Sequence, residues 1–478
     1  MSEKRMIKNF ERLASSPLRR QALLIAEAGL ESINTAKAFE RNFVYDSAAD
    51  RLRILGKKYG LSEFRNVYCI AFGKAAFEGI SSASRILGQR LTSGFAIDVS
   101  NQYPNIPNIV FRTGTHPHPS EQNVKAAKEL VLFAGRAKED DLVLCLISGG
   151  GSSLLCYPHT LDARSQAAII KELMNSGADI FEMNAVRKHL SAVKGGQLAK
   201  IVYPAHLISL IFSDVPGDDL STIASGPTAR DETTVRDATR ILDKHRILEK
   251  LNISSVNPVK SRTPGASADA QAPLEGSVDN NPALAGNLSL TGQAHRTFNG
   301  VKFLETPKEE KYFKKAENIL FVSAKTALNA MRNKAEDLGF EVKIFSEKFQ
   351  GEARGLAGEI IKANDTHHQC LLGAGESTVV VKGHGVGGRN QEMALAALSS
   401  ISENQTLITL ASDGHDNSEA AGAIVDMSAI ERAKNLELDP IGYLENNDSF
   451  SFFESVGDSI ETGLTGSNVA DLVICLKS

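Results

Sequence analysis

Five short runs of apolar and β-branched residues in the first half of the chain predict β-strands. They cover residues 66–72, 93–100, 108–113, 141–147 and 206–212. Between them, apolar residues recur at helical spacing and predict helices over 75–87, 120–137, 162–176 and 182–200, with Ser120 and Asp162 as candidate N-caps. The strand runs lack strict alternation, so we expect them to be covered on both faces. Strands that alternate with helices predict a parallel, doubly wound sheet.

The second half continues with strands that we expect over residues 319–323, 341–345, 378–381, 406–412 and 472–476. Between the halves, residues 254–300 are rich in Pro and Gly, and Phe298 is their only aromatic residue. Such a segment has little apolar surface with which to offset the entropy of ordering. We therefore expect an α/β protein with three parts: a doubly wound domain over 1–253, a disordered insertion or linker over 254–315, and a second α/β domain over 316–478.

Composition and charge exclude several classes of protein. Apolar residues make up 42% and charged residues 23% of the chain, which is typical of a globular protein. The net charge is −4, aromatic residues make up only 6%, and Trp is absent. A nucleic-acid partner is therefore not expected.

The cysteines and the N-terminus bear on where the protein resides. The five cysteines are widely spaced and include no CxxC pair, which favours buried free thiols in a reducing compartment. No apolar run reaches the roughly 20 residues of a membrane span, so we expect no membrane partner. The N-terminal stretch carries Lys4, Arg5 and Lys8 but also Glu3 and Glu11. We expect a cytoplasmic protein, with a mitochondrial presequence as the alternative.

The strongest chemical signal is a loop of glycines and serines directly after the strand predicted over 141–147. Its residues are Ser148, Gly149, Gly150, Gly151, Ser152 and Ser153. Glycines allow positive φ angles and close approach of the backbone, and successive N–H groups before a helix can surround a phosphate. The alternative is a flexible surface turn. The loop is not a Walker A motif, because it contains no GxxxxGK[ST] pattern.

Two further candidates follow other predicted strands. Lys74 lies in the turn Phe72-Gly73-Lys74-Ala75, where its ammonium group can contact a phosphate. Asp214 ends the strand predicted over 206–212, and a carboxylate there suits a Mg²⁺ ligand or a general base. The alternatives are a solvated surface lysine and a turn built from Asp, Pro and Gly.

A fourth candidate lies in the second half, where four glycines precede a helix. Gly387 and Gly388 free backbone N–H groups at the start of this helix, and Arg389 adds a fork suited to phosphate or carboxylate. Asp413, His415 and Asp416 lie at the end of another predicted strand, but two dispersed acids and one histidine do not make a metal site.

These motifs belong to a set that occurs in one order along the chain. The set covers residues 72–75, 148–153, 184–197, 213–228, 387–392 and 462–469. Together, and above all through Gly-Gly-Arg-Asn-Gln-Glu and Thr-Gly-Leu-Thr-Gly-Ser-Asn, they resemble the two-domain glycerate 2-kinases, whose C-terminal part is called the MOFRL domain. The resemblance implies phosphorylation of D-glycerate to 2-phosphoglycerate with ATP and Mg²⁺ in an interdomain cleft. It also implies a Rossmann-like N-terminal domain, a smaller α/β C-terminal (MOFRL) domain, and functional roles for Lys74 and Arg389.

Two other functions and one assembly stay open at this point. A hydroxypyruvate-type oxidoreductase would need a GxGxxG fingerprint leading from a strand into a helix, with an acidic residue about 20 positions on, and we do not identify one in that context. A sensor that binds a phosphorylated metabolite without turnover is the second alternative. It is favoured by departures from the family pattern at 322–325, 374–376 and 413–419. A homodimer is also left open.

Overall fold

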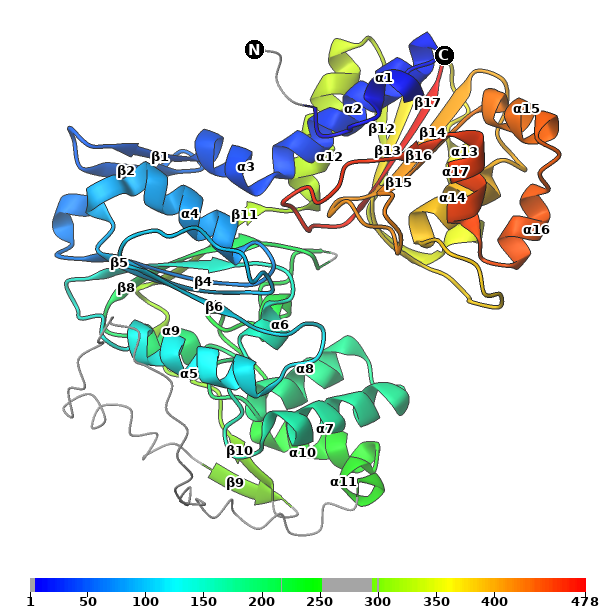
Figure 1. Cartoon of the computed structure of the whole chain (residues 1–478). Helices are drawn as coiled ribbons and strands as arrows, with labels where there is room; N and C mark the ends of the chain where they lie inside the picture. Colours follow the sequence, from blue (N-terminus) through cyan, green and yellow to red (C-terminus); the bar gives the residue numbers. More distant parts are fainter. Residues whose placement is uncertain (1–4, 216, 252–294, 299–300) are drawn as a thin grey trace, which may run out of the picture.

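The computed structural model describes residues 5–215, 217–251, 295–298 and 301–478. The chain forms two α/β bodies, each built around a six-stranded sheet (Figure 1). We call them the first body and the second body, in the order of their sheets along the chain. Two smaller sheets accompany the first body, a meander of β1 (Phe43–Asp46), β2 (Arg51–Ile54) and β3 (Lys57–Gly60), and the pair β9–β10.

The sheet of the first body is entirely parallel and has the strand order β11-β8-β7-β4-β5-β6. Its strands are β4 (Val67–Phe72), β5 (Ser93–Asp98), β6 (Ile109–Thr113), β7 (Leu142–Ile147), β8 (His206–Phe212) and β11 (Ala316–Val322). Every residue of β7 is buried, which fits its uninterrupted apolar sequence. The parallel sheet predicted from the sequence is therefore confirmed.

Helices cover both faces of this sheet, as a doubly wound fold requires. α3 (Thr35–Asn42) and α4 (Ala76–Leu87) pack on one face, and α5 (Glu121–Ala134) and α9 (Gln197–Val202) on the other (Figure 1). A satellite cluster of helices extends beyond α5. It comprises α7 (Ala163–Asn175), α8 (Ile180–His189), α10 (Val235–Lys244) and α11 (Ile247–Lys250). In place of the single helix predicted over 182–200, the structure has α8 and α9, and an irregular segment after His189 separates them.

The sheet of the second body is mixed, in contrast to the parallel sheet of the first body. Its order is β12-β13-β17-β14-β15-β16, and only β12 and β13 are parallel. The strands are β12 (Glu341–Glu352), β13 (Gln369–Thr378), β14 (Gln405–Ala411), β15 (Gly422–Val425), β16 (Ser459–Ile460) and β17 (Asp471–Lys477). The strand predicted over 378–381 is not formed: β13 precedes it and ends at Thr378, and residues 379–381 lie in the following loop. The glycines within 369–378 interrupt the apolar run from which β13 could have been predicted.

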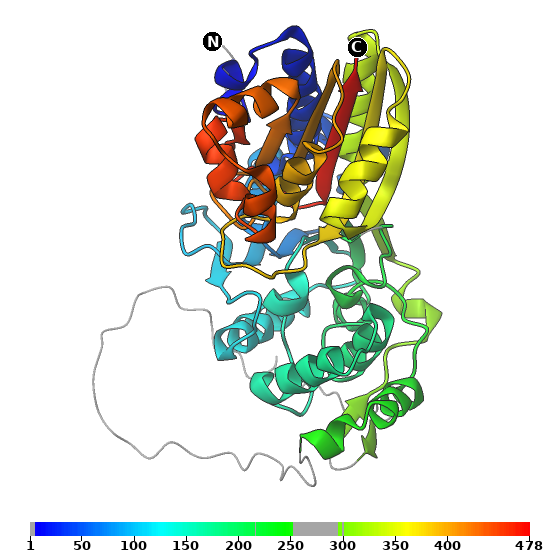
Figure 2. The ribbon, with the colours of Figure 1, turned by 90° about the vertical axis from the view of Figure 1, so that its right-hand side faces the viewer.

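Helices also cover both faces of the second sheet. α2 (Pro17–Ile33) and α12 (Ala324–Asp337) lie side by side on one face. The other face carries α13 (Ala353–Ala363), α14 (Arg389–Ala397), α15 (Met427–Asn435), α16 (Pro440–Glu445) and α17 (Ser449–Val456). Helix α2, from the N-terminal end of the chain, therefore belongs spatially to the second body, and so does α1 (Phe10–Leu13) (Figure 2).

The chain crosses between the bodies at two places. One lies between α2 and α3, at Asn34, and the other between β11 and α12, at Ser323. Strand β11 pairs with β8, so the first strand of the segment 316–478 lies in the sheet of the first body. The division of the chain at 253 and 316 stays a prediction, but the two sheets do not separate at 316.

Part of the predicted linker is ordered. Residues 254–294 and 299–300 lie outside the described residues. β9 (His295–Phe298) pairs with β10 (Val301–Leu304), and Val301, Phe303 and Leu304 are fully buried. Val301 and Phe303 pack into the satellite helices. The expectation of disorder does not hold for 301–304, because these apolar side chains complete that core.

Two expectations about the thiols and the membrane can be compared with the structure. All five cysteines are buried and unpaired. Within the described ranges, no helix is long and apolar enough to cross a membrane.

Candidate active site

The first body places two of the predicted loops at the point where the order of its strands reverses. β4 pairs with β7 on one side and β5 on the other, and Phe72 lies opposite Ile147 at the ends of their strands. The chain leaves β4 toward β5 and leaves β7 toward β8, so the connections diverge. In open α/β sheets, such a divergence creates a crevice beyond the carboxyl ends of the strands, where ligands bind. Lys74 follows β4 here, and the loop 148–153 follows β7.

The two loops interlock through their backbones. The N–H of Lys74 donates to the carbonyl of Gly149 at 2.8 Å, and the N–H of Ala75 donates to the hydroxyl of Ser148 at 3.1 Å. Gly73 has φ +122°, and a side chain on it would overlap with Ser148. Gly150 has φ +77°, so the positive φ expected for this loop is confirmed there.

Two serine hydroxyls of the loop 148–153 already have partners within the protein. The hydroxyl of Ser153 donates to the carbonyl of Pro117, and that of Ser152 lies 3.1 Å from the hydroxyl of Ser225. Both serine side chains are therefore engaged within the protein. The backbone N–H groups of Gly149, Gly150 and Ser152 have no hydrogen-bond acceptor among the described residues. Any anion bound here would thus be held by backbone donors.

Asp214 stands beside this loop at the end of β8. A Cβ atom on Gly149 would lie 2.5 Å from Oδ2 of Asp214, so the carboxylate lies directly over the glycine. The pKa of Asp214 is raised to about 6, mainly by burial and also by the charge of Glu376, against the opposing effect of the Lys74 charge. A carboxyl group with such a pKa is suited to accept a proton near neutral pH.

His116 also borders the loop, a contact that the sequence reasoning missed. A Cβ atom on Gly150 would lie 3.0 Å from the His116 ring and 3.2 Å from Cγ of Lys74. Burial and the charge of Lys74 lower the pKa of His116. This keeps the imidazole neutral at neutral pH. In the sequence, His116 is followed by Pro117, which by itself indicates only a rigid loop.

The second body contributes Asn468 and Glu376. The amide nitrogen of Asn468 lies so close to Gly149 that a Cβ atom there would overlap with it. Glu376 lies near the end of β13 and is close enough to Asp214 to raise its pKa. Nothing in the spacing of these residues pointed to this position; only the packing of the two bodies brings them to the loop 148–153.

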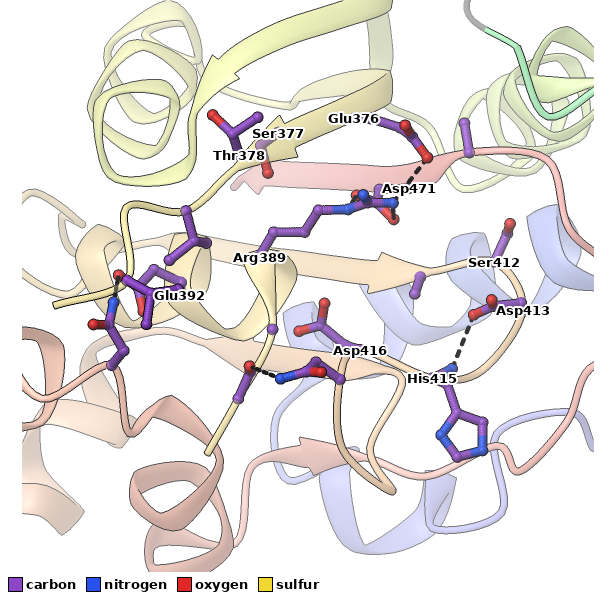
Figure 3. A pocket seen from close by; sticks show the side chains of 18 of the residues that line it. Glu376, Ser377, Thr378, Arg389, Glu392, Ser412, Asp413, His415, Asp416 and Asp471 are labelled. Carbon is purple, nitrogen blue, oxygen red and sulfur yellow. Dashed lines mark hydrogen bonds and ion pairs between the residues drawn. The ribbon is translucent and has the colours of Figure 1, made fainter. Parts of the chain in front are cut away.

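Arg389 lies next to Glu376 at the start of α14 (Figure 3). Its Nε donates to Asp471 at 2.5 Å, and its Nη2 donates to Asp471 at 3.1 Å and to Glu376 at 3.0 Å. Asp471 is buried, and burial raises its pKa to about 7 despite the bond to Arg389. Nη1 of Arg389 has no acceptor among the described residues. The guanidinium group is thus held in place by two carboxylates and keeps one donor free.

The start of α14 differs from the predicted anion site. The carboxylate of Asp416 accepts from the N–H groups of Asn390 at 3.1 Å and Gln391 at 2.7 Å. Asp416 therefore caps the helix and takes the donors that a phosphate would use. Gly388 is required for this contact, because a Cβ atom there would overlap with Asp416. A phosphate-binding role for Gly387 and Gly388 stays a prediction.

A pocket of about 620 Å³ opens beside Arg389 in the second body. It is lined by both charged and polar residues, including Glu376, Arg389, Asp413, Asp416 and Asn468 (Figure 3). Asn468 also lies against Gly149, and the charge of Glu376 acts on Asp214, so this pocket and the crevice of the first body adjoin one another. The candidate site thus continues from one body to the other.

A carboxylate-rich metal centre is not present among the described residues. They contain no group of three or more His, Cys, Asp or Glu side chains arranged to hold a metal ion. Asp214 and Glu376 are two carboxylates whose charges act on one another across the site. Mg²⁺ needs few protein ligands, because it is usually held by one or two carboxylates together with substrate phosphates. The donors present fit Mg²⁺ in that form.

Comparison with known proteins assigns the chain to a family. Residues 21–258 match the family model described as a domain of unknown function, DUF4147, and residues 369–471 match the MOFRL family. The chain is 33% identical over 426 residues to D-glycerate 2-kinase of Thermotoga maritima, covering 86% of this chain and 90% of that protein. It is 33% identical over 445 residues to glycerate 2-kinase of Pyrococcus horikoshii, covering 89% and 90%.

Solved structures agree with these matches. A glycerate kinase from Thermotoga maritima superposes with a TM-score of 0.75 at 28% identity, over 96% of this chain and 98% of that one. A protein from Pyrococcus horikoshii superposes with a TM-score of 0.76 at 30% identity, over 97% and 99%. The fold and its crevice thus define an enzyme with a DUF4147 unit followed by a MOFRL unit. The chain belongs to the glycerate 2-kinase family.

One relative bears on the oxidoreductase alternative. A protein of Agrobacterium vitis, provisionally named a hydroxypyruvate reductase, is 36% identical over 374 residues and covers 75% of each chain. Residues 383–388 have the spacing GxGxxG, which the sequence analysis did not credit. In the structure β13 ends at Thr378, and residues 379–388 run as a loop whose glycines pack on Asn446 and Asp448. This is not the tight strand-to-helix turn that binds a dinucleotide.

Proposed function

We propose that this chain transfers the γ-phosphoryl group of ATP to the 2-hydroxyl group of D-glycerate and produces 2-phosphoglycerate and ADP. The observation that supports it most directly is the meeting of Lys74, Asp214 and the loop 148–153 at the divergence between β4 and β7. Free backbone donors, a lysine and a carboxyl group with a pKa of about 6 are the groups that phosphoryl transfer to an alcohol needs.

Each group has a role in this reaction. The hydroxyl oxygen of glycerate forms a bond to the γ-phosphorus, and the bond between that phosphorus and the β–γ bridging oxygen breaks. Its electron pair leaves with ADP. Asp214 accepts the hydroxyl proton or holds the metal. Lys74 and the amides of Gly149 and Gly150 stabilise charge on the transferring oxygens. Arg389 supplies a second cation from the other body through its free Nη1.

Asp214 and Glu376 are the residues that would hold Mg²⁺ together with phosphate oxygens of ATP. The ion would supply charge neutralisation along the phosphates. The charge of Glu376 raises the pKa of Asp214, and a cation bound between the two carboxylates would offset this repulsion. Glu376 is bound to Arg389, so it links the metal position to the guanidinium group.

A coupled assay of ADP release with D-glycerate tests the proposal, and NMR of the product distinguishes 2-phosphoglycerate from 3-phosphoglycerate. NADH or NADPH oxidation with hydroxypyruvate, in place of ADP release, would favour the oxidoreductase. Calorimetric binding of glycerate and ATP without turnover would favour the sensor. ADP release without a phosphorylated acid would also contradict the proposal.

A further inference from the structure

Two cations of the first body, one buried and one half-buried, have no carboxylate partner in the part of the chain that the structure describes. Lys194 is 3% exposed, and its Nζ donates to the carbonyl of Ser152 at 2.7 Å. Arg187, on α8, is half-buried, and no carboxylate among the described residues pairs with it or with Lys194. The pKa of Lys194 is lowered to about 8, mainly by burial and in part by the charge of Arg187. The two cations are therefore close enough to repel one another.

The other two fully buried lysine and arginine side chains among the described residues are paired. Lys188 is 4% exposed, and its Nζ forms an ion pair with Asp231 at 2.9 Å. Arg19, 1% exposed, forms ion pairs with Asp426 and Asp458 at 2.7 Å each. Burial of a charge without a partner is costly, so folds pair such groups or keep them for a ligand. Lys194 departs from this pattern, and a second unpaired cation, Arg187, lies close to it.

Their position next to the glycine loop connects them to the candidate site. Ser152 belongs to the loop, and its hydroxyl lies 3.1 Å from that of Ser225, which in turn donates to Oδ1 of Asn184 at 3.1 Å. Asn184 precedes Arg187 by three positions on α8, so both side chains lie on the same face of the helix. That face packs against the short 3-10 helix Ile223–Ser225. The two cations thus approach the loop from the side of the first body.

We propose that Arg187 and Lys194 bind the carboxylate of the substrate, with its hydroxyl groups directed toward Lys74 and Asp214. This inference rests on the proposed function and names the part of the site that selects a hydroxy acid over a neutral alcohol. An arginine fork binds a carboxylate through two parallel hydrogen bonds, and an adjacent lysine adds a point charge. A bound carboxylate would supply the anion that both cations lack.

Steady-state kinetics of Arg187→Met and Lys194→Met test the assignment. We expect the KM for D-glycerate to rise by about 10-fold or more in each variant, since a charged hydrogen bond contributes about 1.5–3 kcal/mol. The KM for ATP should change by less than about threefold, because no nucleotide group needs these cations. Arg187→Lys should recover part of the loss. Arg240→Met, at an exposed arginine of α10, is the matched control and should leave both constants unchanged.

The wild-type protein offers a test that does not depend on whether a variant folds. The methyl ester of D-glycerate keeps both hydroxyl groups but has no carboxylate. We expect its kcat/KM to fall at least about 10-fold below that of D-glycerate. An ester that is used as well as the acid would overturn the assignment, and so would an unchanged KM for glycerate in both methionine variants.

Calorimetry with D-glycerate alone separates this inference from the proposed function. If the wild type binds glycerate without ever releasing ADP, and Arg187→Met abolishes that binding, the carboxylate site stands and the kinase proposal fails. If the wild type releases ADP and Arg187→Met binds glycerate as tightly as the wild type, the kinase stands and the carboxylate site fails.

Discussion

The side-chain amide of Asn468, in the second body, lies against the backbone of Gly149, in the first. A Cβ atom on Gly149 would overlap with this amide and would lie 2.5 Å from the carboxylate of Asp214. The loop that contains Asn468 also receives Asn34 at the crossing between the bodies, whose Nδ2 donates to the carbonyl of Thr465 at 2.7 Å. One loop therefore contacts both the crossing between the bodies and the candidate active site.

Gly149→Ala should impair catalysis while the protein stays folded. The methyl group displaces Asp214 or Asn468, and a shift of about 1 Å in a reacting group costs on the order of 10²-fold in rate. ADP release measures the loss, and circular dichroism checks the fold. Gly355→Ala, in α13, is the control, because a Cβ atom there meets no other atom within 4 Å. A fully active Gly149→Ala protein would remove Asp214 and Asn468 from the reaction.

Lys74→Met should lower kcat by on the order of 10²–10⁴, which is the usual cost of losing a preorganised contact to the transition state. Lys74 is exposed, so its replacement should change stability by no more than about 0.5 kcal/mol. Rapid-quench or steady-state ADP release measures kcat, and a thermal melt measures stability. Wild-type turnover in this variant would make Lys74 an ordinary surface charge.

The test of Arg389 requires a second substitution, at Asp471, because removal of Arg389 leaves the buried carboxylate of Asp471 without its cation. We expect Arg389→Met to lose stability as well as activity. Arg389→Met with Asp471→Asn removes both charges and should recover stability, while kcat stays down by on the order of 10²–10⁴. Asp471→Asn alone is the control for the second change. Recovery of full activity in the paired variant would show that Arg389 only supports the fold.

Asp214 should limit activity at acid pH. Its pKa of about 6 means that kcat/KM should rise as the pH increases through about 6, because only the carboxylate accepts a proton or binds a metal. A pH profile of ADP release measures this. Asp214→Asn should be inactive at every pH, whereas Asp218→Asn, in the neighbouring turn, should keep the wild-type profile. A wild-type profile with no step near pH 6 would contradict the role of Asp214.

The same carboxyl group should make the protein less stable at neutral pH. Its pKa is about 6 in the folded state and near 3.8 when unfolded, so the folded state favours the protonated form. The free-energy penalty is absent below about pH 4, grows between pH 4 and 6, and is complete above pH 6. Asp214→Asn should therefore be more stable than the wild type at pH 7, by on the order of 1–3 kcal/mol. This difference should vanish near pH 4 in denaturant melts.

Replacement of residues 254–294 by a short Gly/Ser linker should preserve turnover. These residues are poor in apolar side chains, and a change in loop length costs only about 0.6 kcal/mol per doubling. Phe303→Ala, a few residues beyond, should cost about 3–5 kcal/mol, because Phe303 is fully buried among the satellite helices. ADP release and thermal melts compare the two. An inactive but folded linker variant would mean that the segment acts at the site.

The candidate site was predictable only where a functional residue follows a strand. Lys74, Asp214 and the loop 148–153 each end a run of apolar residues, so sequence pattern and strand order suffice to bring them to one edge of a sheet. Glu376 and Asn468 were missed as site residues, because their position depends on how two bodies pack. The segment 301–304 was misjudged because its apolar residues border a long polar stretch.

Local physics explains what the sequence alone determined: apolar runs become buried strands, glycine-rich turns follow them, and the parallel first sheet results. Contacts between distant segments decided the rest. α2 packs beside α12 in the second body, although about 300 residues separate them, because both have an apolar face that only the second sheet covers. The carboxylate of Asp416, and not a bound phosphate, caps α14. Glu376 accepts a hydrogen bond from Arg389 and lies close enough to Asp214 to raise its pKa. The pairing of charged and polar groups in a site depends on which groups lie close together in the folded structure. The pattern of hydrophobic residues along the chain does not encode that proximity.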